Sequence, residues 1–187
     1  MKLNFFTKTE LLIAHPHKFF EKIQKEKDKW KEFEFLFIYI FLAVVINALF
    51  IMPSIIKEKS VLPLLPYIFI IILFIFLLIV SSLILSLAFF AIAFVYHLII
   101  KLFTGKRNLK ETYKLVYAFT PILLALLIPF YSAFEIIFFP AIALAALDTI
   151  YINYVGLRKL HKMTKENAIA VLVVMMLIII GILFFLR

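Results

Sequence analysis

The sequence contains no cysteine, which excludes disulfide bonds, thiolate metal sites and cysteine nucleophiles. It has only three glycines and no Gly-x-Ser-x-Gly, His-Glu-x-x-His or phosphate-loop pattern. The four histidines are scattered, and His15 and His17 do not have the spacing of a helical metal pair. We therefore expect no metal and no cofactor, and we predict that the chain is not an enzyme.

Charged residues are absent from the whole stretch 61–100. The chain as a whole is 66% hydrophobic, whereas a soluble domain is roughly half apolar. This excess cannot fit inside one globular core of 187 residues, so much of it must face lipid. The N-terminal residues do not have the pattern of a cleavable signal. The composition predicts one integral membrane domain without a second, soluble domain.

Five apolar segments have the length of a membrane span. The second would be about 50 Å long as a helix, more than the hydrocarbon core of about 30 Å. Its interior has no Gly or Pro, only Ser81 and Ser82, which favours one long helix, tilted or bent at the serines, over a hairpin. Pro121 and Pro129 interrupt or kink the third predicted span. We predict an all-α polytopic bundle with spans at about 35–52, 67–100, 115–134, 136–155 and 168–186 within a membrane domain of residues 35–187.

Residues 1–34 form a charged segment before the first span. Phe19, Phe20, Ile23 and Trp30 fall near one face of a helix, with lysines among them. One interpretation is an amphipathic helix that lies on the membrane with its aromatic side chains towards lipid. The other is a solvated charged helix that leads into the first span. Both remain open from the sequence.

The basic residues are distributed unevenly between the two sides of the predicted bundle. Eight Lys and Arg residues precede the first span, five follow the second and four follow the fourth, so that 17 of 20 fall on one side. By the positive-inside rule, the N-terminus is cytoplasmic and the C-terminus is outside. We expect the plasma membrane as location. The net charge of +9 then indicates contact with anionic lipid headgroups rather than with nucleic acid.

Asp148 is the strongest anomaly within the predicted spans. It lies ten residues before Arg158, about 15 Å into the membrane on a helix. An acid at this depth usually faces a protein interior or water. One interpretation is an ion, substrate or proton site, and the other is a hydrogen-bonded acid that holds helices together. Asn47, Ser82 and Ser86 lie at comparable depth and complete the predicted polar site.

Four stretches of the sequence form an ordered set of motifs. They are Leu11 to Phe20 with Pro16; Gly105 with Leu109-Lys110-Glu111-Thr112-Tyr113; Tyr117-Ala118-Phe119-Thr120-Pro121 with Pro129; and Tyr154-Val155-Gly156-Leu157 with His161, Lys165 and Ala168-Ile169. Together they resemble the Yip family, the Ypt/Rab-interacting membrane proteins, and the first resembles the entry segment of prokaryotic members. The resemblance covers nearly the whole chain. It implies five spans, a cytoplasmic N-terminus, oligomerisation and, for eukaryotic members, binding of Rab GTPases. The chain lacks the long N-terminal region and the Asp-Leu-Tyr-Gly-Pro stretch of the eukaryotic group, so we do not expect Rab binding.

These observations favour a membrane organiser or adaptor that acts through a basic cytoplasmic face. The partner would be a second copy of the chain or another membrane protein. A small transporter or channel built around Asp148 is the alternative. A lipid-interacting protein, with the N-terminal segment on the membrane, is the second alternative. The residues predicted for the cytoplasmic interaction face are Gly105, Thr112, Tyr117, Pro121, Gly156 and His161.

Overall fold

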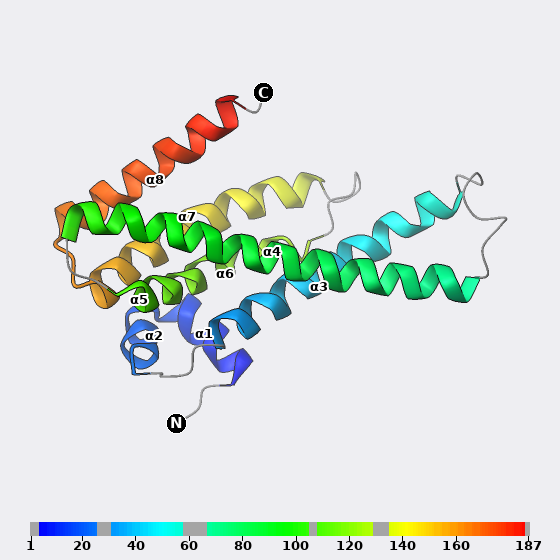
Figure 1. Cartoon of the computed structure of the whole chain (residues 1–187), viewed down its shortest axis with the longest axis horizontal. Helices are drawn as coiled ribbons and strands as arrows, with labels where there is room; N and C mark the ends of the chain where they lie inside the picture. The colour runs from blue at the N-terminus through cyan, green and yellow to red at the C-terminus, as the bar shows by residue number, and fades with distance from the viewer. Residues whose placement is uncertain (1–3, 26–30, 58–66, 105–107, 129–134, 186–187) are drawn as a thin grey trace.

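A computed structural model describes residues 4–25, 31–57, 67–104, 108–128 and 135–185, and these residues form helices without a β-strand. The short helices α1 (Phe5–Ala14) and α2 (Pro16–Ile23) precede the long helices α3 (Lys31–Lys57) and α4 (Tyr67–Thr104) (Figure 1). Three short elements follow: α5 (Leu109–Tyr113), the 3-10 helix η1 (Lys114–Phe119) and α6 (Thr120–Ala125). The last two elements are α7 (Glu135–Leu160) and α8 (Lys165–Phe185). The predicted all-α class is confirmed for this part of the chain.

Helix α4 is a single helix of 38 residues, about 57 Å long. The serines in its middle do not open a turn. Ser82 Oγ donates to the Leu78 carbonyl at 2.7 Å, and Ser86 Oγ donates to the Ser82 carbonyl at 2.8 Å. Such bonds back to the preceding turn satisfy the hydroxyls within the helix. The preference for one long helix over a hairpin therefore agrees with the structure.

The residues predicted as the third span fold differently. Residues 114–125 form η1 and α6, which together extend about 21 Å, less than the hydrocarbon thickness of about 30 Å. Pro121 stands at the start of α6, where its missing N–H costs no helical hydrogen bond. Pro129 lies outside the described residues. A five-span topology thus stays a prediction.

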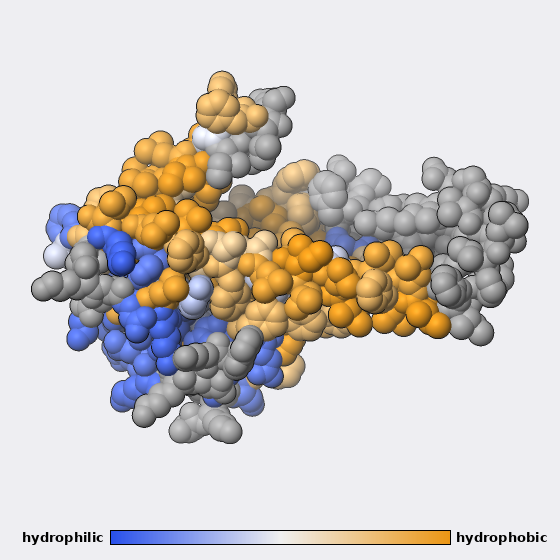
Figure 2. Space-filling model, in the orientation of Figure 1, coloured by the Kyte–Doolittle hydropathy of each residue, from blue (hydrophilic) through white to orange (hydrophobic). Residues whose placement is uncertain are grey.

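Three helices in the described part of the chain are long and apolar enough to cross a membrane: Lys31–Phe50 in α3, Ile72–Phe103 in α4 and Ile136–Leu160 in α7. Many large apolar side chains of α4 and α8 are exposed, and Figure 2 shows them as a continuous hydrophobic surface. Hydrophilic residues gather instead at one end, over the short helices α1, α2 and α5. An apolar surface along the long helices and a hydrophilic surface at one end suit a protein whose hydrophilic end lies at the membrane surface.

One face of the N-terminal segment packs on the rest of the protein. Phe19 and Phe20 of α2 are 0% exposed, Ile23 is buried as well, and α2 packs on α7. The interpretation that turns these three side chains towards lipid is therefore wrong. Their pattern of apolar and charged positions instead marks a helix with one face in a protein core. Trp30 lies outside the described residues.

Candidate functional site

Three basic segments that are far apart in sequence meet at one end of the molecule. Lys159 of α7 pairs with the Glu21 carboxylate of α2. Lys114 Nζ donates to the Gln24 carbonyl at 3.1 Å. Asn167 Nδ2 of α8 donates to the Phe103 carbonyl of α4 at 3.4 Å. We call this region, made of α1, α2, α5, η1 and the α7–α8 turn, the polar end.

The surface of the polar end is basic. Beside the Glu21 carboxylate, the hydrogen bond and charge of Lys159 hold the pKa of that acid below its ordinary value. Backbone and Thr164 hydrogen bonds lower the pKa of Glu166 in the first turn of α8. Both acids therefore stay ionised near neutral pH, and the surrounding cations still outnumber them. The exposed cations of this surface are Lys18, Lys22, Lys25, Arg158, Lys162 and Lys165.

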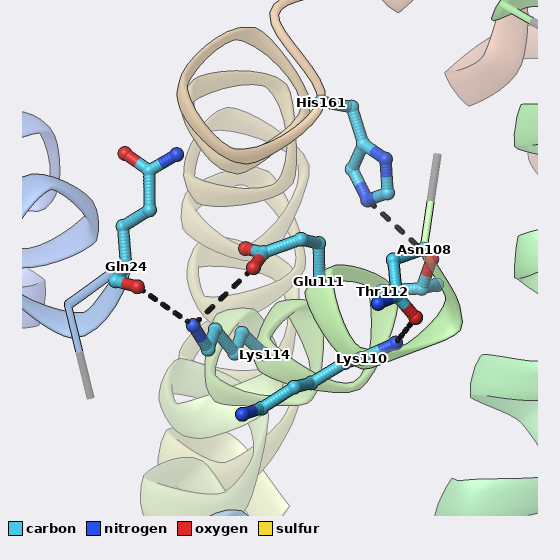
Figure 3. A network of polar contacts seen from close by, with 7 residues as sticks. All are labelled: Gln24, Asn108, Lys110, Glu111, Thr112, Lys114 and His161. Atoms are coloured by element: carbon cyan, nitrogen blue, oxygen red, sulfur yellow. Dashed lines mark hydrogen bonds and ion pairs between the residues drawn. The ribbon is translucent and has the colours of Figure 1, made fainter. Parts of the chain in front are cut away.

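Beneath this surface, a buried hydrogen-bond chain joins α4, α5 and the end of α7. The Thr112 hydroxyl lies 2.8 Å from His97 Nδ1 and 3.4 Å from His161 Nε2. All three side chains are buried, and Figure 3 shows His161 pointing at Thr112 across the helix ends. No cluster of metal-ligand type is found among the described residues. The arrangement joins three helix ends.

Two lysines are buried in the polar end. Lys114 is 1% exposed, and its ammonium lies 3.5 Å from the Glu111 carboxylate in addition to the Gln24 carbonyl (Figure 3). Lys8 Nζ donates to the Tyr117 hydroxyl at 3.3 Å and lies 5.3 Å from the centre of that ring. Neither lysine was predicted to be buried from the sequence. The i,i+3 spacing of Glu111 and Lys114 was a signal for the first.

The residues predicted for the interaction face lie in the interior. Thr112, Tyr117, Pro121, Gly156 and His161 are all buried, and Gly105 lies outside the described residues. They cannot contact a partner directly in this conformation. Their place is the framework under the basic surface, because the ring of Tyr117 packs against Phe19 and Phe35 while Thr112 and His161 join helix ends.

Asp148 does not gather with the polar residues predicted beside it. Its side chain lies on the exposed face of α7, and it has no hydrogen bond or ion pair within the described ranges. Asn47 Nδ2 donates to the carbonyls of Ala43 and Leu126, each at 2.9 Å, and Ser82 and Ser86 bond within α4. Of these four residues, these hydrogen bonds join only Ser86 to Ser82, within α4, whereas the sequence suggested one polar site.

The chain was compared with models of known protein families. The family model described as the Yip1 domain matches residues 10–186. The chain belongs to the Yip1 domain family. The match begins inside α1 and runs past the end of α8, so it includes the polar end from residue 10 onward. Comparisons with curated proteins and with solved structures gave no match.

Gly156 has no room for a side chain. A Cβ atom there would lie 2.5 Å from Leu115 Cδ2 and 3.0 Å from the Phe20 ring. We expect Gly156→Ala to lower the free energy of unfolding by about 1–3 kcal/mol, because both neighbours are buried and must shift. Gly181→Ala is the matched control, since a Cβ at Gly181 meets nothing within 4 Å. That control should be neutral or slightly stabilising, owing to the higher helix propensity of alanine. Denaturant titration in detergent measures both, and equal stabilities would contradict the prediction.

Proposed function

We propose that this Yip1 domain protein is a non-enzymatic membrane adaptor whose basic surface binds the acidic face of another membrane protein. One observation carries the proposal: exposed cations of α2 and of the α7–α8 turn lie at the same end of the molecule. Packing of α2 on α7 holds the two sets in a fixed relation. A fixed array of like charges favours a partner of opposite charge and increases its rate of association.

The orientation follows from the same surface. We infer that the polar end lies in the cytoplasm, at the plasma membrane, because basic segments beside membrane spans are retained on the cytoplasmic side. Anionic headgroups of the inner leaflet would lie next to these cations. The buried state of His97, Thr112 and His161 supports a non-enzymatic role, since a substrate has no access to them.

Self-association is the second part of the proposal. Asp148 is exposed on α7 among apolar side chains that include Leu144, Leu147 and Tyr151. A carboxylic acid that faces lipid is costly, by about 2.5–3.5 kcal/mol at the centre of a span. Contact of α7 with a second copy of the chain would remove this acid from lipid. The same placement favours a helix contact over a transport site.

Charge reversal tests the adaptor proposal. The triple variant Lys18→Glu, Lys22→Glu, Arg158→Glu should reduce crosslinked complexes in native membranes roughly tenfold, because like charges then face an acidic partner. The control Lys18→Arg, Lys22→Arg, Arg158→Lys keeps every charge and should retain the complexes. Self-association is measured separately, by crosslinking between two differently tagged copies of the chain in the same membranes. Unchanged crosslinking of the reversed variant, at equal expression and stability, would contradict the proposal.

A further inference from the structure

A groove lies at the junction of α3, α4 and α5, and none of the six exposed cations of the basic surface lines it. Its volume is about 790 Å³, within the range of sites that hold small molecules. Much of its wall is apolar and comes from Phe33 of α3 and from Leu83, Leu87 and Phe90 of α4. Both helices belong to the segments that are long and apolar enough to cross a membrane. A molecule that enters this groove from the membrane must therefore present hydrocarbon to these side chains.

Aromatic rings connect the apolar wall to α5. The rings of Phe33 and Phe90 are 5.8 Å apart, and those of Phe90 and Tyr113 are 5.2 Å apart. Helix α5 packs beside α4, and its N-cap is Asn108, whose side chain accepts from the Lys110 backbone N–H at 3.1 Å. The groove is thus bounded by the start of α3, the middle of α4 and the first turn of α5.

The polar part of the lining carries both signs of charge. Glu32 supplies a carboxylate and is only 4% exposed, whereas Lys110 supplies an ammonium. Both residues also have interactions elsewhere in the chain. A carboxylate is an acceptor for a primary ammonium group, and a lysine ammonium is a donor to phosphate oxygens.

We propose that this groove binds one phospholipid whose headgroup contains both a phosphate and a primary ammonium. The acyl chain lies against Leu83, Leu87 and the Phe33 and Phe90 rings. The phosphate pairs with Lys110 and the ammonium pairs with Glu32. This site differs from the basic surface, which attracts anionic headgroups in general, because it selects a headgroup of mixed charge.

Native mass spectrometry of the full chain in detergent tests the lipid class. Phosphatidylethanolamine, phosphatidylglycerol and phosphatidylcholine with identical acyl chains are titrated separately. We expect phosphatidylethanolamine to bind about tenfold more tightly than the other two, which corresponds to about 1.4 kcal/mol. Phosphatidylglycerol lacks the amine, and phosphatidylcholine lacks the N–H donors. Equal affinity for all three would overturn the proposal.

A matched pair of variants tests the location. Leu83→Trp should fill the groove and lower retention of phosphatidylethanolamine about tenfold. Ile92→Trp is the control, because nine residues are about two and a half helical turns, which places it on the opposite side of α4. The exposure of the two side chains is alike, 42% and 43%. Equal loss of lipid retention in both variants would overturn the assignment. A Leu83→Trp variant that changes the mass of the oligomer but retains the lipid would also overturn it, because a second copy of the chain would then occupy the groove.

The polar contacts have their own test. Lys110→Gln should reduce binding of phosphatidylethanolamine and leave the melting temperature near that of the wild type, because Lys110 is half-buried and not part of the core. Unchanged binding in this variant would remove Lys110 from the site and overturn the headgroup assignment.

Discussion

Replacement of Phe20 by alanine should lower the free energy of unfolding by about 3–5 kcal/mol, the range for loss of a buried aromatic side chain. Phe20 is 0% exposed, and its ring packs against Phe19 with the centroids 5.3 Å apart. It also lies beside the backbone of Gly156 in α7. The cavity would therefore open at the contact between α2 and α7. We expect α2 to detach, with faster amide hydrogen exchange over residues 16–23.

Phe6→Ala is the control for this prediction. Phe6 also belongs to the N-terminal segment but is 79% exposed, so its replacement should change stability by less than about 0.5 kcal/mol. Denaturant titration gives the free energies, and exchange measured by mass spectrometry localises the change. A similar, small effect of both substitutions would show that α2 lies on the membrane surface and that its burial against α7 is not maintained.

The contrast between these two phenylalanines shows how far the sequence alone could predict the N-terminal segment. The spacing of Phe19, Phe20 and Ile23 correctly indicated a helix with one apolar face. It could not identify what covers that face, because lipid and a protein core both accept aromatic side chains. The partner is α7, more than one hundred residues further along the chain. Long-range packing of this kind leaves no local signal.

The long apolar helices were predictable for a physical reason. A stretch such as residues 67–100, without charge, Gly or Pro, has few alternatives to a helix when no water is present to satisfy its backbone. Over residues 114–125 the structure has the 3-10 helix η1 and the short helix α6 instead of one long α-helix, and apolar content does not report such local geometry. Asp148 was found as an anomaly, but its helix face could not be assigned without the neighbouring helices.

Lys114 is one of the two buried lysines that were not predicted from the sequence. Its removal should have the second large effect. Lys114→Met keeps much of the apolar stem but removes the ammonium that contacts the Glu111 carboxylate and the Gln24 carbonyl. The Gln24 carbonyl then loses its hydrogen-bond donor, and the partly buried Glu111 carboxylate loses its opposite charge. We expect a loss of about 2–4 kcal/mol in the free energy of unfolding, because unpaired buried groups cost more than their pairing contributes. The lower part of the range applies if water reaches Glu111, whose side chain is 23% exposed.

A double-variant cycle separates this explanation from simple loss of packing. Glu111→Gln in the Lys114→Met background removes the unpaired carboxylate, so the double variant should be less destabilised than the sum of the two single variants. Lys18→Met, at an exposed position of α2, controls for the loss of one positive charge and should change stability by less than about 0.5 kcal/mol. Strictly additive effects would show that Lys114 and Glu111 do not interact. In that case the attachment of α2 to η1 would depend on the bond to the Gln24 carbonyl and on the aromatic contact between Phe19 and Tyr117.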